Sequence, residues 1–352
     1  MSFRFSRCFE VKIVFCLVFS FVTSLALILP CGAATVNIIF DTDMDTDCDD
    51  AGAIAILHVL ADRGEANILA TMVSSKYEWS VPCLDAINTY FGRAYLPIGV
   101  VKGPGAPTDR GSRYTKQIAD KFPHDLTADK APDAVELYRQ ILSIEPDRSV
   151  VIVTVGYLTN LSNLLKSKPD RYSPLTGKQL VAKKVKHYVC MGSRYPIEDE
   201  PGIWGNFKPD PAAVVHVAAE WPTKITFTGG GKFAEDLATG ARLATQVLVD
   251  SPVRCAYELY FGGTSKKRHS ADQIAVLVAV RGTGKPWKLV TEGYNYIFPN
   301  GNHEWRVTPN DPRHQYISAL ADGVQPSHVA EVIEDLMVTP PKGRGQNGGK
   351  SE

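Results

Sequence analysis

The chain has 352 residues, of which 44% are hydrophobic and 22% are charged, a composition typical of a globular protein with a large core. Its 38 basic and 38 acidic residues give a formal net charge of +0 at pH 7. A neutral chain with no stripe of basic and aromatic residues argues against a nucleic acid or an anionic membrane as a partner.

The start of the chain has the pattern of a signal peptide. Basic residues come first, residues 13–29 are almost entirely apolar, and small residues follow up to Ala34. We predict that residues 1–34 are removed on export and that the mature protein is secreted or periplasmic, with no membrane contact after cleavage. A retained membrane anchor is the alternative, although the apolar stretch is near the short limit of the ~20 residues that span a bilayer.

Apolar, β-branched runs alternate with helix-like segments along the rest of the chain. In chain order, we expect strands at residues 36–41, 67–74, 96–101, 149–155, 186–191 and 224–228. We expect helices at residues 51–63, 81–92, 158–166, 210–220, 234–249, 252–261, 271–280 and 326–337, with a hairpin-like stretch at 287–307. This order predicts an α/β fold with a doubly wound, mostly parallel sheet and helices on both faces.

No linker or internal repeat interrupts this pattern. We therefore predict a single domain at residues 35–339. Residues 340–352 are rich in glycine, lysine and glutamine, and we predict that they form a disordered tail.

Six aspartates stand within ten residues, in the segment Asp41-Thr42-Asp43-Met44-Asp45-Thr46-Asp47-Cys48-Asp49-Asp50. The segment joins a predicted buried strand to a predicted apolar helix, so it lies at the sheet edge where ligands bind in such folds. Carboxylates this close would repel one another, and a hard cation with oxygen ligands, such as Ca²⁺, would hold them together. A solvated loop, in which Asp49 caps the helix, is the plainer interpretation.

Two known acidic motifs fit this segment poorly. An EF-hand that starts at Asp41 would have Thr46 where glycine is needed and Gly52 where the bidentate glutamate is needed. A haloacid-dehalogenase-type phosphatase begins with Asp-x-Asp, as in Asp41 to Asp43, but Asp45 stands at its Thr/Val position. The late acidic stretch that would bind magnesium in such a phosphatase is also missing, so this remains the weaker alternative.

The segment resembles the signature of the inosine/uridine-preferring nucleoside hydrolase family, in particular its exported branch. The pattern of that branch is Phe-Asp-Thr-Asp-Met-Gly-x-Asp-x-Asp-Asp-Ala, and this chain matches it over residues 40–51 except at Asp45. Further segments resemble the family in the same order, at residues 85–93, 97–99, 153–161, 191–193, 206–213 and 270–277. The resemblance covers about residues 36–281. It implies the nucleoside hydrolase-like fold, which has a Rossmann-like core.

The resemblance also implies a function, namely Ca²⁺-dependent hydrolysis of the N-glycosidic bond of a nucleoside or a related glycoside by metal-activated water. The implied Ca²⁺ ligands are Asp43, Asp50, the backbone carbonyl of Val155, and Asp272. Carboxylates, a carbonyl and open positions for water and sugar hydroxyls suit this cation. Asp43 would also be the catalytic base that takes the proton of the attacking water.

For the substrate, the resemblance assigns the ribose hydroxyls to Asp49 and Asn206. The carboxylates around the sugar would stabilise the positive charge that develops at its anomeric carbon. The segment is two residues longer than in better-known members of the family, so Asp47 is a further candidate metal ligand in place of Asp43 or Asp49.

Other departures concern the leaving group. The family often has a histidine directly before the last aspartate, where this chain has Ala271, and a glutamate two residues before Asn206, where it has Trp204. We expect His269 on an exposed basic face, which leaves His303 as the candidate on the base side of the substrate. A non-catalytic relative that binds a sugar or nucleoside is therefore an alternative, and a homo-oligomer is left open.

Overall fold

The computed structural model describes residues 34–103, 111–196 and 204–343. The predicted signal peptide, apart from Ala34, and the predicted tail after Gly343 lie outside these ranges. The first residues of the predicted tail pack on the domain, since Pro341 is buried and the Lys342 backbone N–H donates to the Asp62 carboxylate over 3.1 Å. In the described ranges, no helix is both long and apolar enough to cross a membrane.

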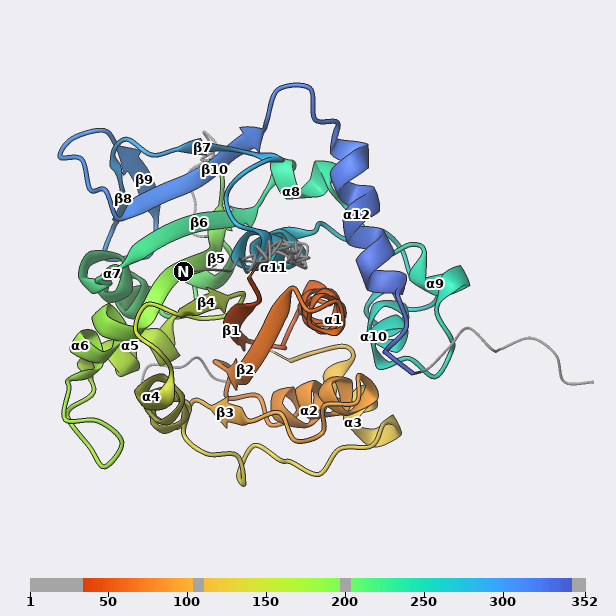
Figure 1. Ribbon diagram of the computed structural model, residues 1–352. Coiled ribbons are helices and arrows are strands. Elements are labelled where there is room, and N and C mark those ends of the chain that lie inside the picture. Colours follow the sequence, from red (N-terminus) through yellow and green to blue (C-terminus); the bar gives the residue numbers. More distant parts are fainter. Residues whose placement is uncertain (1–33, 104–110, 197–203, 344–352) are drawn as a thin grey trace, which may run out of the picture. The chain divides into compact units, whose positions relative to one another are not determined.

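An eight-stranded sheet forms the centre of the domain (Figure 1). In spatial order, its strands are β3 (Ile98–Val100), β2 (Ala66–Val73), β1 (Val36–Thr42), β4 (Val150–Thr154), β5 (Val185–Arg194), β6 (Lys224–Gly230), β10 (His314–Leu320) and β7 (Trp287–Val290). Neighbouring strands are parallel except β10 and β7, which are antiparallel. A separate antiparallel hairpin joins β8 (Tyr294–Ile297) to β9 (His303–Arg306).

Helices cover both faces of the sheet and bury one apolar cluster against each face. The helices on the first face are α1 (Asp49–Asp62), α2 (Ser80–Tyr90), α3 (Thr115–Lys121), α10 (Pro252–Phe261), α11 (Ala271–Arg281) and α12 (Pro326–Val338). Those on the second face are α4 (Ala134–Ile144), α5 (Thr159–Lys166), α6 (Gly177–Lys184) and α7 (Pro211–Glu220). The predicted doubly wound α/β fold is confirmed.

Strand β1 shows why the central strands read as continuous apolar runs. Ile38 and Phe40 point into the first cluster, whereas Ile39 points into the second. Successive side chains of a strand alternate between the two faces, so a strand with helices on both sides is apolar at every position. β1 pairs with β2 on one side and β4 on the other, and this central position places the acidic segment after Thr42 in the middle of the sheet's carboxyl edge.

The prediction of one long helix at residues 234–249 is wrong. The structure has two short helices there, α8 (Lys232–Asp236) and α9 (Leu243–Gln246). Between them the chain is extended, because Thr239 exchanges backbone hydrogen bonds with Arg268 and Gly240 has a positive φ of 111°. The next segment toward the site is also short, a 3₁₀ helix η1 (Gly205–Phe207) after β5.

Candidate active site

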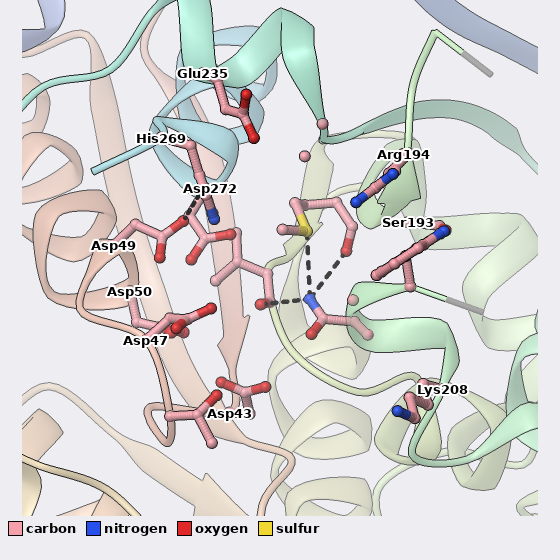
Figure 2. Close-up of a pocket in the computed structure, with 18 residues that line it drawn as sticks. Asp43, Asp47, Asp49, Asp50, Ser193, Arg194, Lys208, Glu235, His269 and Asp272 are labelled. Atoms are coloured by element: carbon pink, nitrogen blue, oxygen red, sulfur yellow. Dashed lines mark hydrogen bonds and ion pairs between the residues drawn. The ribbon is translucent and has the colours of Figure 1, made fainter. Parts of the chain in front are cut away.

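A cavity of about 340 Å³ opens at the carboxyl ends of β1, β4, β5 and β6, where ligands bind in parallel sheets of this kind. Its volume is within the range of small-molecule sites. Carboxylates gather on one side of it, and Ser193, Arg194 and Lys208 lie on the other (Figure 2). The predicted site residues that line it are Asp43, Asp47, Asp49, Asp50, Val155, Asn206 and Asp272. We call its five aspartates the acidic wall.

Two helix N-termini carry most of the acidic wall. Asp49 and Asp50 occupy the first turn of α1, and Asp272 occupies the first turn of α11. The positive end of a helix dipole favours a carboxylate at these positions. The two helices pack against each other on the same face of the sheet, so aspartates that are more than 200 positions apart in the sequence meet at one point.

Asp50 and Asp272 are the aspartates that most need a positive charge nearby. Burial, together with the negative charge of Asp49, raises the pKa of each well above its ordinary value. The Thr42 hydroxyl donates a hydrogen bond to Asp50, but the buried Oδ1 of Asp272 has no hydrogen-bond partner among the described residues. Converging carboxylates with too few donors are the arrangement that a hard cation such as Ca²⁺ stabilises, so these residues fit the predicted metal.

Backbone packing brings the remaining parts of the site close to the acidic wall. The Asn206 Nδ2 donates to the carbonyl oxygen of Val155 over 2.7 Å and to that of Met191 over 3.2 Å. At Gly156, an added Cβ would lie 2.3 Å from the backbone nitrogen of Asp43. Only glycine therefore allows the turn after β4 to approach the end of β1 so closely. Val155 and Asp43 are neighbours for this reason.

His269 lies in the site, and the expectation that it lies on an exposed face is wrong. Its Nδ1 is 3.2 Å from Asp49 Oδ2, and its side chain is 19% exposed. Burial alone would raise the pKa of Asp49, but the positive charges of His269 and Arg268 hold it below its ordinary value. Burial likewise opposes the charge on His269, yet Asp49 raises the pKa of this imidazole. The pair therefore keeps Asp49 ionised and favours the protonated histidine.

Asp47 has partners of its own. The Arg268 guanidinium lies 2.7 Å from its carboxylate, and the Tyr260 hydroxyl donates to it over 3.1 Å. The ligand atoms of Asp47, Asp49 and His269 also lie within 4.8 Å of one another, which is close enough for a shared metal ion. Because Arg268 already balances Asp47, this aspartate is a weaker candidate ligand than Asp43, Asp50 and Asp272.

Two aspartates of the segment do not line the cavity. Asp41 is fully buried and accepts hydrogen bonds from the Tyr138 hydroxyl over 2.9 Å and from Asn160 Nδ2. Asp45 is also fully buried and accepts hydrogen bonds from Ser75 and Tyr157. A phosphatase nucleophile at Asp41 would need to face the cavity, so the geometry argues against that alternative.

No protein-family model matches the sequence, and no curated protein matches it. An inosine-guanosine nucleoside hydrolase matches in structure with a TM-score of 0.64 and 17% identity, over 86% of this chain and 98% of that one. A purine-preferring ribonucleoside hydrolase from Gardnerella vaginalis matches with a TM-score of 0.64 and 16% identity, over 86% and 99%.

A third solved structure is the type III effector protein XopQ complexed with adenosine diphosphate ribose, which matches with a TM-score of 0.61 and 14% identity, over 87% of this chain and 93% of that one. The chain has the nucleoside hydrolase fold. The resemblance read from the acidic segment is thus confirmed for the fold, and the matches extend over nearly the whole length of each neighbour.

Within the nucleoside hydrolase fold of this chain, His303 lies apart from the acidic wall. It is in β9, where its ring stacks on Tyr195 with the centroids 4.9 Å apart and meets the edge of Phe207. Burial lowers the pKa of His303 to about 4, so it is neutral at pH 7. His303 is not among the described residues that line the cavity, and its place on the base side of the substrate stays a prediction.

The departure at Asp45 has a simple structural outcome. The positive backbone angle of the segment falls at Met44, with a φ of 43°, rather than at Asp45. The Thr42 hydroxyl accepts a hydrogen bond from the Met44 N–H over 3.0 Å, which holds this conformation. The segment therefore turns without glycine, and Asp45 points into the interior.

Proposed function

We propose that this protein is a Ca²⁺-dependent hydrolase that cleaves the N-glycosidic bond of a ribonucleoside or a closely related riboside. The observation that carries the proposal is the convergence of Asp43, Asp49, Asp50 and Asp272 with Asn206 in one cavity at the carboxyl edge of the sheet. The nucleoside hydrolase fold supports it, because this edge is the ligand site of such sheets.

Asp43, Asp50, Asp272 and the carbonyl oxygen of Val155 would hold the cation. A bound Ca²⁺ would lower the pKa of a coordinated water and orient the sugar. The Val155 oxygen accepts one hydrogen bond, from Asn206, and a carbonyl oxygen has a second lone pair for a further partner. Asp43 lines the cavity and is 6% exposed, so it can take the proton of the attacking water as a general base.

Asp49 and Asn206 would bind the ribose. Asp49 is kept ionised by His269, so it accepts hydrogen bonds from sugar hydroxyls and stabilises positive charge at the anomeric carbon. The two backbone carbonyls that bind the amide nitrogen of Asn206 fix the orientation of its side chain. Fixed groups lose little entropy when the substrate binds, which favours a defined position for the bond to be cleaved.

We assign the protonation of the leaving base to His269. It lines the cavity beside Asp49, and Asp49 raises its pKa, which favours the protonated imidazole. Its Nδ1 contacts Asp49, which leaves Nε2 as the atom that can donate a proton. This role replaces the histidine that the family places where this chain has Ala271.

The test is release of free base and reducing sugar from a panel of nucleosides, measured with Ca²⁺ and after chelation. We expect release with Ca²⁺ and a loss of at least about 100-fold on chelation. Asp43→Asn should lose turnover and weaken Ca²⁺ binding, whereas Asp236→Asn, at an exposed ion pair on α8, should behave like the wild type. An active Asp43→Asn variant would overturn the role of Asp43.

A second candidate function is binding without turnover. The effector protein whose structure matches this chain was solved with adenosine diphosphate ribose. Trp204 stands where the family often has a glutamate, and this change also favours a binding role. Tight binding of a nucleoside or of adenosine diphosphate ribose, with no product after many hours at high protein concentration, would support this second candidate.

We also propose that the protein is exported and that residues 1–34 are removed. The support is the pattern of the leader alone. Expression with the leader intact, followed by N-terminal sequencing of the protein outside the cytoplasm, should give a chain that starts directly after Ala33 or Ala34. Recovery of the uncut chain in the membrane fraction would favour the anchor.

A further inference from the structure

The wall opposite the acidic wall has the reverse charge. Ser193, Arg194 and Lys208 line the cavity there (Figure 2). Arg194 is the last residue of β5, and Lys208 directly follows η1, so two elements carry the cations of this wall. We call these three residues the basic wall. The cavity thus presents carboxylates at one end and cations at the other.

Arg194 has a defined position in the basic wall. Its guanidinium carbon lies 3.7 Å from the ring centre of Trp204. Stacking of this kind uses the face of the guanidinium, while its N–H groups lie in the plane of the group. A planar guanidinium with parallel N–H donors matches the oxygens of a phosphate.

Ser193 supplies a second sign that a ligand belongs here. The residue is 2% exposed, and its buried Oγ has no hydrogen-bond partner among the residues that the structure describes. A buried hydroxyl without a partner is costly, so a ligand oxygen in the cavity would satisfy it. This hydroxyl lies next to Arg194, at the end of the cavity away from the predicted cation site.

Lys208 differs from the basic residue beside the acidic wall. Arg268 is paired with Asp47 and lies 3.8 Å from Asp49, so it neutralises the acidic wall. Lys208 is exposed, and within the described ranges its ammonium forms no ion pair. Glu235, the other acidic residue of the lining, lies beside His269 on the far side of the cavity (Figure 2).

Because the cavity has carboxylates on one wall and cations on the other, we propose that the substrate carries a phosphate group attached to its ribose. This proposal rests on the proposed function. The ribose binds at Asp49 and Asn206, and the phosphate binds at Ser193, Arg194 and Lys208. A neutral nucleoside would leave the buried Ser193 hydroxyl without a partner and would offer no negative charge to the Lys208 ammonium. A phosphate carries about −1.5 to −2 charges at pH 7 and offers several acceptor oxygens.

The reaction leaves the phosphate unchanged. Water adds across the bond between the anomeric carbon and the base nitrogen: a carbon–oxygen bond forms, the carbon–nitrogen bond breaks, and the base leaves with a proton. The products are a free base and a phosphorylated ribose. A nucleoside 5′-monophosphate and a nucleoside diphosphate ribose both have a phosphate attached to the ribose. The experiment below distinguishes these two classes of substrate.

The experiment measures kcat/KM for each nucleoside and for its phosphorylated form. Adenosine is compared with adenosine 5′-monophosphate, and uridine is compared with uridine 5′-monophosphate. Adenosine diphosphate ribose is measured in addition. We expect the preferred phosphorylated substrate to exceed its nucleoside roughly tenfold or more. Preference for the monophosphate or for the diphosphate ribose identifies the source of the phosphate. A ratio near one for every pair would overturn the proposal.

Variants test where the phosphate binds. Lys208→Gln and Arg194→Gln should each lower the ratio of phosphorylated to plain substrate by roughly tenfold. Lys178→Gln, at an exposed ion pair with Glu220, is the matched control and should leave the ratio unchanged. An unchanged ratio in both Lys208→Gln and Arg194→Gln would contradict the assignment of the basic wall.

The outcome also separates this inference from the proposed function. If no substrate releases base, the hydrolase proposal fails, and calorimetric titration then decides the phosphate question by itself. Tighter binding of adenosine 5′-monophosphate than of adenosine, lost in Lys208→Gln, would still support the basic wall as a phosphate site. Base release from nucleosides without any phosphate preference would keep the hydrolase and reject the phosphate.

Discussion

One short segment gives rise to two groups of carboxylates with different surroundings. Asp41 and Asp45, the inner pair, are fully buried and do not line the cavity, and they accept hydrogen bonds from hydroxyl and amide groups. Asp50, from the same segment, joins Asp272 in the acidic wall, where burial and mutual repulsion raise the pKa of both. Burial raises the pKa of Asp41 to about 7 against the effect of its donors, whereas neighbouring carboxylates add to the rise at Asp50 and Asp272.

This difference distinguishes the structural from the functional aspartates of the segment. Composition cannot do so, because all six aspartates are identical in the sequence. The charges around each carboxylate can, because nearby carboxylates raise the pKa of Asp50 and Asp272, whereas burial raises that of Asp41. An isolated buried carboxylate has only the cost of its burial, which donors reduce, whereas in a buried cluster the carboxylates also repel one another, and a bound cation or protonation relieves that repulsion.

The largest expected effect is the difference between Asp272→Asn and Asp41→Asn. We expect Asp272→Asn to lose turnover by about 1,000-fold and to weaken Ca²⁺ binding strongly, because it removes one charge of the cation site. Asp41→Asn should still bind Ca²⁺, since Asp41 does not line the cavity. Calorimetric titration of both variants is the measurement. Equal loss of Ca²⁺ binding in both variants would contradict the distinction between the acidic wall and the inner pair of aspartates.

The second prediction concerns the cation and stability. A saturating cation that binds only the folded state stabilises it by about 2.7 kcal/mol at 100 times its Kd, which should raise Tm by roughly 5 °C. The raised pKa values of Asp50 and Asp272 mean that the cation-free protein loses stability as pH rises through them. The Ca²⁺-induced shift in Tm should therefore be larger at pH 8 than at pH 5.

A differential scanning experiment with Ca²⁺ or a chelator at both pH values checks this. Asp272→Asn serves as the matched variant and should show little shift. A shift that is the same at both pH values would mean that the acidic wall is not what responds to the cation.

Much of the fold could be predicted from local patterns. The alternation of apolar strands and helices gave the doubly wound sheet, because each such element is a short stretch whose burial shows in its own residues. Strand β10 and helices α3, α4 and α6 were missed. Helix α4 did carry a signal, since Asp133 caps it by accepting hydrogen bonds from Val135 and Glu136.

The site was predictable only in part, because tertiary contacts decide which way a side chain points. The aspartate-rich segment predicted four of the five aspartates of the acidic wall. The resemblance to the family predicted the fifth, Asp272, and also Asn206. His269 was misjudged, because the three basic residues before it suggest a solvent-exposed face, whereas Arg268 and His269 turn inward to Asp47 and Asp49. Ser193 had no sequence signal, since a serine at a strand end is common.

The third prediction tests the inner group through pH. Burial raises the pKa of Asp41 to about 7, although Tyr138 and Asn160 oppose the shift. An acid with a raised pKa in the folded state costs stability as pH rises from its unfolded value through its folded value. Asp41→Asn removes that cost, so its free energy of unfolding relative to the wild type should rise by about 2 kcal/mol from pH 5 to pH 8.

Urea denaturation at several pH values measures this difference, and saturating Ca²⁺ keeps the acidic wall in one state. Asp125→Asn, at an exposed carboxylate far along the chain, is the control variant. A flat profile for Asp41→Asn as well would mean that Asp41 titrates normally and that its donors fully offset its burial.

The smallest expected effect comes from His269, which links the acidic wall to its surroundings. His269→Gln keeps a polar side chain but removes the positive charge 3.2 Å from Asp49, so the pKa of Asp49 should rise and the acid limb of the pH profile of kcat/KM should move to higher pH. Loss of the proton donor should also lower kcat by roughly tenfold or more. His328→Gln, at an exposed histidine of α12, is the control.

If the acid limb stays in place while kcat falls, His269 acts on the leaving base alone. If both stay unchanged, the ionisation of Asp49 depends on Arg268, and the acidic wall is balanced without its histidine.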